Sequence, residues 1–253
     1  MSASSDKYYQ AEITERRDFS HDLWAVRVKA DGQLAFKPGQ YATFGVVENE
    51  KAIERPYSIV SSPYEDTLEF FFELVPAGEL TPRLHRLQPG DKLVMRKAAK
   101  GRFTLDLQSG RKRHFLLATV TGLAPYVSMV RTLYRDWKQG RFPEGTQLFV
   151  LQGASRSWEL GYREEFENYA REVPWLRYIP TVSRPWEDKA WKGEVGRCED
   201  ILRKYSDQFE ATPEDTVAYL CGHPEMIEKG KGILKRRGFS KEALREEQYW
   251  VQK

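Results

Sequence analysis

Apolar and polar residues alternate along the first part of the chain, up to about residue 105. Trp24 and Val26 occupy alternate positions, and the segment 68–74 repeats this pattern. Further apolar runs cover 41–47 and 92–97, with Gly, Pro and Asp residues between the runs. A repeat of two residues is typical of a β-strand with one buried face. Short strands at such even spacing predict an antiparallel β-barrel.

One short helix is predicted within this barrel. Thr81 suits the N-cap, Pro82 suits the first helical position, and Leu84 and Leu87 form an apolar side. The free N–H groups at the start of a helix attract anions. The residues alone leave two interpretations open, an anion site or a capped connection without a ligand.

After a polar, basic stretch at 109–114 the pattern changes to strands that alternate with helices. Strands are predicted at 115–120, 147–152, 176–182 and 217–221, and helices at 125–139, 157–172 and 224–237. This βαβ order predicts a parallel, doubly wound α/β sheet. We therefore expect two domains, an antiparallel barrel over 1–110 and an α/β domain over 111–253.

Within the barrel, Arg55-Pro56-Tyr57-Ser58 combines a cation, a rigid residue, an aromatic ring and a hydroxyl group. We interpret it as the start of a strand that runs through Ile59 into a turn. Alternate side chains of a strand share a face, so Arg55 and Tyr57 are expected on one side and Ser58 on the other. Such a strand suits a flat, anionic cofactor, because the guanidinium can pair with a phosphate. The alternative is an ordinary barrel strand with a surface arginine and a packed tyrosine.

Small, polar and cationic residues follow the predicted parallel strands, where such sheets bind their ligands. Thr121-Gly122-Leu123-Ala124-Pro125 predicts a tight turn into a helix, which suits a pyrophosphate or is simply a strand–helix connection. Cys221, beside Gly222, is either a buried structural thiol or a polarisable group next to a reacting ring.

Three arginines, Arg156, Arg177 and Arg184, are predicted at or near strand ends on the same rim. Together they would enclose a phosphomonoester, whereas each taken singly is typical of a solvated surface.

Composition narrows the classes of function. With 40 Lys and Arg against 37 Asp and Glu, the net charge of +3 argues against a nucleic-acid partner and leaves an acidic protein partner open. No stretch has the length and apolar character of a membrane span or a signal peptide, so a soluble, cytoplasmic protein is expected. A monomer is expected as well. The 2 cysteines form no CxxC pair and the 4 histidines show no metal-ligand spacing, so no metal site is expected.

Four motifs in order carry a resemblance that covers nearly the whole chain: Arg55–Ser58, Thr121–Pro125, the Cys221–Met226 stretch, and Tyr249-Trp250 near the end. Together they resemble the plant-type ferredoxin–NADP reductase family, in particular its bacterial branch. The resemblance implies FAD and NADP as cofactors, and a hydride exchange between them. It also implies single-electron exchange with a separate carrier protein, ferredoxin or flavodoxin.

The resemblance also implies a role for individual residues. FAD would be held by Arg55, Pro56, Tyr57, Ser58, Ile59, Gly78, Leu80 and Thr81, with Tyr249 over the flavin face and Trp250 on the adenine. NADP would be held by Thr121, Gly122, Pro125, Gly222, Arg156, Arg177 and Arg184, the arginines at its 2'-phosphate. The catalytic group would be Ser58, Cys221, Glu247 and Tyr249.

The chain departs from the family pattern at two places. Val120 stands where the family has glycine, and three residues follow Trp250. A reductase of free flavin and a non-catalytic nucleotide sensor are the two alternative functions.

Overall fold

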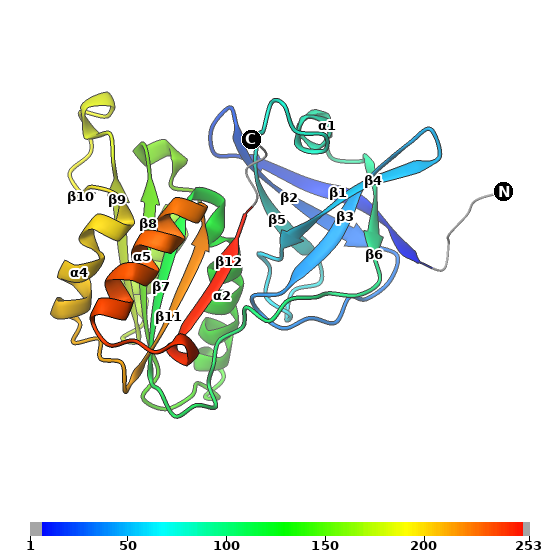
Figure 1. Cartoon of the computed structure of the whole chain (residues 1–253). Helices are drawn as coiled ribbons and strands as arrows, with labels where there is room; N and C mark the ends of the chain where they lie inside the picture. Colours follow the sequence, from blue (N-terminus) through cyan, green and yellow to red (C-terminus); the bar gives the residue numbers. More distant parts are fainter. Residues whose placement is uncertain (1–6, 250–253) are drawn as a thin grey trace. The chain divides into compact units, whose positions relative to one another are not determined.

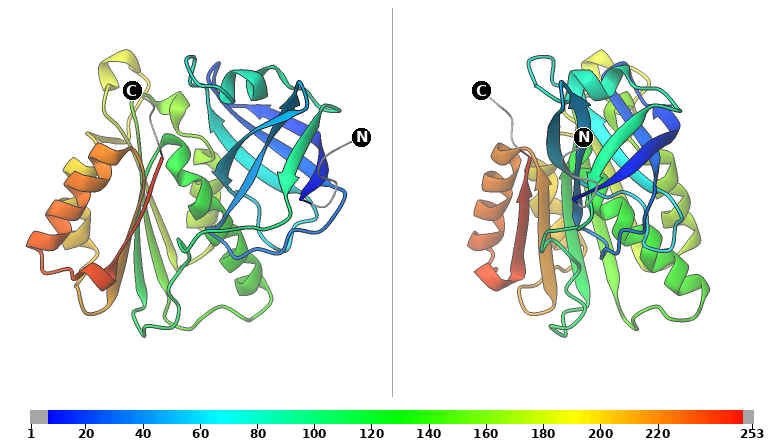
Figure 2. Two further views of the ribbon diagram at one scale, coloured as in Figure 1. Left: turned by 45° about the vertical axis from the view of Figure 1, so that its right-hand side comes forward. Right: turned by 90° about the vertical axis from the view of Figure 1, so that its right-hand side faces the viewer.

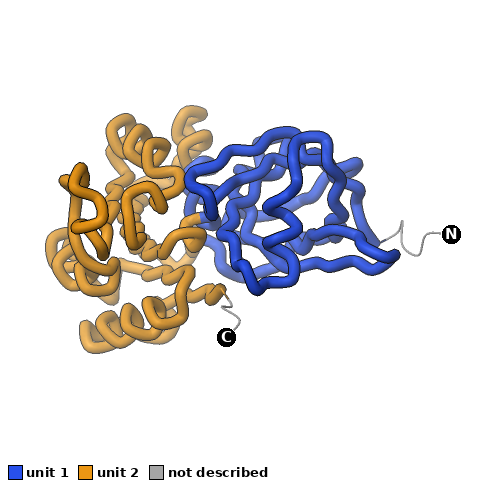
Figure 3. The backbone as a smooth tube through the Cα atoms, turned by 90° about the horizontal axis from the view of Figure 1, so that it is seen from above, with its two compact units in different colours: residues 1–104, 124–132 blue, residues 105–123, 133–253 orange. Residues whose placement is uncertain are grey.

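The computed structural model describes residues 7–249 (Figure 1). The chain divides into two compact units, and Figure 3 shows them in blue and orange. Unit 1 holds residues 1–104 and 124–132, and unit 2 holds 105–123 and 133–253. The predicted cofactor domains 1–110 and 111–253 stay a prediction.

Unit 1 is built around a six-stranded antiparallel sheet with the strand order β4-β3-β6-β1-β2-β5. Its strands are β1 (Tyr8–Asp18), β2 (Leu23–Ala30), β3 (Tyr41–Glu48), β4 (Lys51–Ser58), β5 (Leu68–Glu73) and β6 (Lys92–Arg96). The segment after β4 returns to β5, where Ile59 bridges Phe70 and the Val60 N–H donates to the Glu69 carbonyl at 2.8 Å. This contact joins the two edges of the sheet, so the predicted antiparallel barrel is confirmed.

The alternating residues fill the barrel. Trp24, Phe70 and Phe72 are each at most 1% exposed, and the Trp24 and Phe72 rings lie 5.2 Å apart. Burying a side chain of this size contributes about 1.5–3 kcal/mol, which is why the periodicity of two predicts these strands reliably.

Helix α1 (Thr81–Arg86) has the predicted place, with a proline in its first turn and a buried Leu84, but the predicted N-cap is wrong. The N-cap is Leu80, and no side chain caps the helix. Thr81 Oγ1 instead accepts from the Val75 N–H at 3.0 Å and lies 3.2 Å from the Val75 carbonyl oxygen. Its hydroxyl closes the preceding loop, because that loop offers it both a donor and an acceptor.

Unit 2 contains a six-stranded sheet with the order β10-β9-β8-β7-β11-β12, in which neighbouring strands are parallel. The strands are β7 (Arg113–Thr119), β8 (Gln147–Ala154), β9 (Leu176–Val182), β10 (Glu194–Val195), β11 (Thr216–Gly222) and β12 (Leu244–Gln248). The helices are α2 (Ala124–Lys138), which the two units share, and α3 (Arg163–Glu172), α4 (Cys198–Gln208) and α5 (Pro224–Arg236). Over residues 7–249, four 3-10 turns complete the elements: η1 (Val120–Leu123), η2 (Ser157–Glu159), η3 (Pro185–Glu187) and η4 (Lys241–Ala243).

Helices cover both faces of this sheet. Helices α4 and α5 lie on one face of the sheet (Figure 1 and Figure 2). Phe115 of β7 shares a buried cluster there with Leu202 of α4 and Ile227 of α5. On the other face, Tyr178 of β9 packs its ring 5.2 Å from Phe166 of α3. The predicted parallel, doubly wound arrangement is therefore confirmed.

Three local predictions for this unit differ from the structure. Val120 does not end strand β7 but begins η1 with a positive φ of 43°. The helix predicted over 157–172 is broken, because Tyr162 adopts the left-handed conformation before α3 begins. Strands β10 and β12 were not predicted: β10 has only two residues, and β12 carries the polar sequence LREEQ at the sheet edge.

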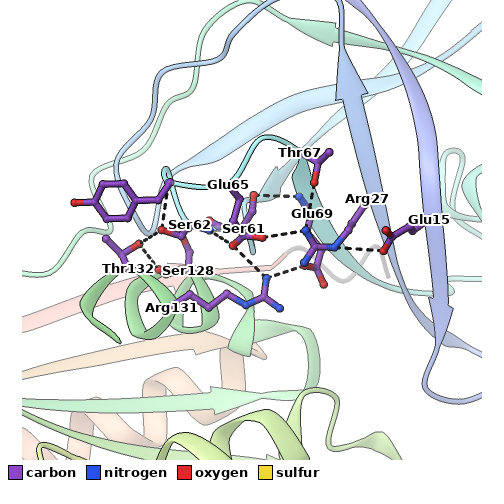
Figure 4. A network of polar contacts seen from close by, with 11 residues as sticks. Glu15, Arg27, Ser61, Ser62, Glu65, Thr67, Glu69, Ser128, Arg131 and Thr132 are labelled. Atoms are coloured by element: carbon purple, nitrogen blue, oxygen red, sulfur yellow. Dashed lines mark hydrogen bonds and ion pairs between the residues drawn. The ribbon is translucent and has the colours of Figure 1, made fainter. Parts of the chain in front are cut away.

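A polar network ties the first half of α2 into unit 1 (Figure 4). The buried Glu69 carboxylate lies 2.7 Å from Arg27 and 2.7 Å from Arg131. The Ser128 hydroxyl donates to the Ser61 carbonyl at 2.7 Å. A carboxylate buried to this degree is stable only when it is paired, so the network fixes α2 to the barrel.

We expect Arg131→Met to lower the free energy of unfolding by about 2 kcal/mol, because Glu69 loses one of its two arginines while it stays buried. The exposed Arg135→Met on the same helix is the matched control and should stay within about 0.5 kcal/mol. Urea denaturation of both variants measures the difference. Equal loss in the two variants would contradict the role of the network.

His114 is fully buried, and neither ring nitrogen has a hydrogen-bond partner within the described residues. Burial lowers its pKa from 6.5 to about 4, although the charge of Asp106 acts in the opposite direction. The unfolded histidine takes up a proton below pH 6.5, whereas the folded one resists protonation until about pH 4. Stability is therefore complete above pH 6.5 and declines as the pH falls toward 4.

We expect His114 to account for about 2 kcal/mol of lost stability between about pH 7.5 and 5. His114→Phe should remove this part of the pH dependence, and His21→Asn, at an exposed position, should keep it. Chemical denaturation at the two pH values measures the slope. An unchanged slope in His114→Phe would disprove the assignment.

Candidate active site

The turn after β7 and the end of β11 lie in direct backbone contact. A Cβ atom on Gly122 would overlap the Cys221 carbonyl oxygen, and one on Gly222 would overlap Thr119 Oγ1. The same Thr119 Oγ1 accepts from the His223 N–H at 2.9 Å. Only glycine fits at 122 and 222, so the residues that the sequence placed at these two strand ends do come together.

Strand β12 adds two more predicted site residues. Its pairing with β11 places Glu247 opposite Cys221, and the Tyr249 N–H donates to the Gly222 carbonyl at 3.1 Å. Burial raises the pKa of the Cys221 thiol well above its usual value, the charge of Glu247 raises it further, and a hydrogen bond from the Tyr249 side chain opposes both. Cys221 is therefore a neutral thiol with a carboxylate and a phenol beside it.

The conformation of Val120 explains why glycine would suit this position. A positive φ is unusual for a β-branched residue and unrestricted for glycine. Val120 is only partly buried, and its side chain packs against the cluster of Ala154, Leu160, Val182 and Trp191. This packing offsets the backbone strain, so the turn retains its shape without glycine.

Arg156 and Arg184 lie side by side at the carboxyl ends of β8 and β9, where the Arg184 N–H donates to the Ser155 carbonyl at 2.9 Å. Both point to one carboxylate: Glu187 lies 2.5 Å from Arg156 Nε and 3.8 Å from Arg184 Nη1. Arg156 also binds Glu159 at 2.8 Å, and these two hydrogen bonds raise its pKa.

Arg177 does not belong to this group, so its predicted place on the same rim is wrong. It is the second residue of β9, at the amino end of the strand. At about 3.3 Å per residue, Arg177 and Arg184 are separated by roughly 20 Å along the chain. Its guanidinium donates to the Pro174 and Leu176 carbonyls at 3.1 Å each.

In unit 1, Arg55-Pro56-Tyr57-Ser58 ends strand β4 and does not begin a strand as predicted. Arg55 and Tyr57 pair with alternate residues of β3 and so share a face, while Ser58 is 5% exposed. The Tyr57 ring lies 5.1 Å from Phe44 and 4.9 Å from Phe72, and its burial raises the pKa of its hydroxyl.

The loop before α1 lies close to this strand. Arg55 Nη2 binds the Glu79 carboxylate at 2.7 Å, and the Gly78 N–H donates to the Val75 carbonyl at 2.8 Å. Leu80 is buried, which fixes the loop to the barrel. The structure thus brings the predicted residues Arg55, Gly78 and Thr81 into one part of unit 1. Trp250 lies outside the described residues.

The sequence analysis did not identify several site residues at the strand ends of unit 2. Ser155–Glu159 and Ser183–Glu187 repeat the pattern S-R-x-W-E, and each copy follows a parallel strand and forms a 3-10 turn. Trp158 and Trp186 are 47% and 69% exposed. The repeat is visible in the sequence, so comparing the two strand ends would have found Glu159 and Glu187.

Within residues 7–249, no group of three or more His, Cys, Asp or Glu side chains is arranged to hold a metal ion. Among the same residues, no helix has both the length and the apolar character needed to cross a membrane.

Comparison with known proteins gives matches to both halves. Residues 10–105 match the oxidoreductase FAD-binding domain and residues 116–231 the oxidoreductase NAD-binding domain. The chain is 32% identical over 250 residues to ferredoxin–NADP reductase A of Sorangium cellulosum, covering 92% of this chain and 84% of that protein. The chain belongs to the ferredoxin–NADP reductase family.

Other family members agree. The flavodoxin/ferredoxin–NADP reductase of Rhodobacter capsulatus is 29% identical over 224 residues, covering 83% of this chain and 79% of that protein. A ferredoxin NADP+ reductase from Neisseria gonorrhoeae, solved with bound FAD and NADP, has the same fold, with a TM-score of 0.85 at 23% identity over 97% of this chain and 100% of that one. The predicted family is confirmed, and the two matching domain families are an FAD-binding and an NAD-binding domain, in the predicted order.

Since a Cβ on Gly122 has no space, we expect Gly122→Ala to destabilise unit 2 by about 2–4 kcal/mol. Gly232→Ala in helix α5 is the matched control, because a Cβ there would meet only the end of the Arg236 side chain at 3.5 Å. The control should be neutral or up to about 1 kcal/mol more stable. Thermal unfolding measures both variants, and equal melting temperatures would refute the tight contact.

Proposed function

We propose that this protein is a ferredoxin– or flavodoxin–NADP reductase that holds FAD on unit 1 and NADP on unit 2. The grouping of Cys221, Glu247 and Tyr249 beside the glycine turn at the carboxyl edge of the parallel sheet carries the proposal. This edge is where nucleotides bind in doubly wound folds.

The residues of unit 1 fit FAD. Arg55 already binds a carboxylate, and the same guanidinium N–H groups can donate to the anionic oxygens of a phosphate. We assign the flavin to Tyr57 and Ser58, with Pro56 and Ile59 keeping the strand in place. We assign the pyrophosphate to Arg55 and to the loop of Gly78, Leu80 and Thr81.

The residues of unit 2 fit NADP. Gly122 and Gly222 bring the turn after β7 into close contact with the end of β11, and Pro125 lies in the first turn of α2. We assign the pyrophosphate to Thr121, Gly122 and Pro125. Arg156 and Arg184, which together bind a carboxylate, are assigned to the 2'-phosphate.

When bound, flavin and nicotinamide supply the hydride exchange and the single-electron steps. The chain itself positions and shields the reacting atoms. Ser58 is buried at the end of β4, where its hydroxyl would orient the flavin edge. Cys221 would present a neutral thiol to the nicotinamide, and Glu247, opposite it on β12, would take part in a proton relay. Tyr249 would cover the flavin and move aside for the nicotinamide.

The electron carrier is proposed to be a separate ferredoxin or flavodoxin, as the names of the relatives suggest. We further propose that the protein acts as a monomer in the cytoplasm.

Anaerobic mixing with NADPH and then NADH tests the proposal. Rapid bleaching of a bound flavin by NADPH is the expected result. A protein that purifies colourless would instead support a free-flavin reductase. Bound flavin that neither nucleotide bleaches would support a nucleotide sensor.

Ser58→Ala should slow flavin reduction by NADPH at least about tenfold, which is about 1.4 kcal/mol in the barrier, because the hydroxyl would act on the reacting edge. FAD content should change much less. Stopped-flow absorbance measures the rate, and FAD release on dilution measures the affinity. The exposed Ser109→Ala is the control. If Ser58→Ala loses FAD but the loaded protein reacts at the normal rate, Ser58 only binds the cofactor.

A further inference from the structure

The two S-R-x-W-E turns hold their glutamates in different ways. Glu159 Oε2 accepts from the Ser155 N–H at 2.9 Å and the Arg156 N–H at 3.1 Å, so it is part of its own turn. Glu187 has a different environment. Within the described residues, its carboxylate contacts only two side chains, Arg156 at 2.5 Å and Arg184 at 3.8 Å.

The charges of this group balance without any ligand. Arg156 and Arg184 bring two positive charges, and Glu159 and Glu187 bring two negative ones. A 2'-phosphate adds nearly two further negative charges, so it competes with a carboxylate for the same N–H donors.

Glu187 is the carboxylate that a phosphate can displace. It lies on the short turn η3, and its side chain is 34% exposed, against 16% for Glu159. Glu159 also keeps its two backbone donors, whereas the contacts of Glu187 are ion pairs near the surface, which are weak.

We propose that Glu187 is an internal competitor for the Arg156–Arg184 pair and determines how strongly the protein prefers a 2'-phosphate over a 2'-hydroxyl. This inference rests on the proposed NADP site and adds a specificity residue to it. The carboxylate occupies the two arginines before the nucleotide binds, and it must leave them when a 2'-phosphate arrives. A nucleotide without that phosphate leaves the ion pairs intact.

Calorimetric titration with 2',5'-ADP and 5'-AMP tests the inference without any redox reaction. Glu187→Gln should bind 2',5'-ADP about tenfold more tightly than the unchanged protein, which corresponds to about 1.4 kcal/mol. Affinity for 5'-AMP should change less than about twofold, because no phosphate competes for the arginines. Glu164→Gln, an exposed glutamate on α3, changes the net charge equally and should alter neither affinity.

Two results would overturn the inference. In the first, Glu187→Gln binds 2',5'-ADP as the unchanged protein does, so the carboxylate does not compete. In the second, Glu187→Gln weakens 5'-AMP, so the carboxylate accepts a hydrogen bond from the ribose.

Arg156→Gln and Arg184→Gln test the underlying site separately. Each should lower the affinity for 2',5'-ADP more than that for 5'-AMP. If neither does, the proposed 2'-phosphate site is wrong. If both arginine variants show this selective loss while Glu187→Gln has no effect, the 2'-phosphate site is supported and only the proposed role of Glu187 is wrong.

Discussion

The close backbone contact between the turn after β7 and the end of β11 determines the candidate active site of unit 2. Because Gly122 and Gly222 have no space for a side chain, the two segments pack directly against each other, and both glycines are buried. Thr119, one residue before the turn, accepts a hydrogen bond from the His223 N–H through its side-chain oxygen. The predicted site residues Gly122, Cys221 and Gly222 lie at that contact.

The edge strand β12 reaches the same contact through its pairing with β11. Its pairing with β11 continues up to Gly222, whose carbonyl accepts from Tyr249. Apolar burial contributes little to the position of this polar strand, since Leu244 is its only residue that packs against the core cluster. The backbone hydrogen bonds of β11 hold it, and they carry Glu247 and Tyr249 to Cys221. The site is therefore assembled by sheet pairing and not by apolar packing.

This explains what could be predicted from the sequence. The barrel strands and most of the parallel strands bury apolar side chains, so their periodicity or apolar runs reveal them, as at Trp24 and Phe115. Strand β12 and turn η1 lack that signal, because hydrogen bonds and a positive φ define them. Arg177 was misplaced for a related reason: a residue near a strand end lies on the ligand edge only at the carboxyl end, and Arg177 begins its strand.

The sequence also identifies cations more readily than it identifies their partners. Arg55 and Arg156 were predicted as phosphate ligands, and each binds a carboxylate, Glu79 and Glu187 respectively. In the absence of a phosphate, an arginine at such a site pairs with a nearby carboxylate, because the charge-assisted hydrogen bonds are favourable. That pairing weakens phosphate binding by the energy needed to break it. The affinity of such a site is thus determined as much by the glutamates as by the arginines that a motif search detects.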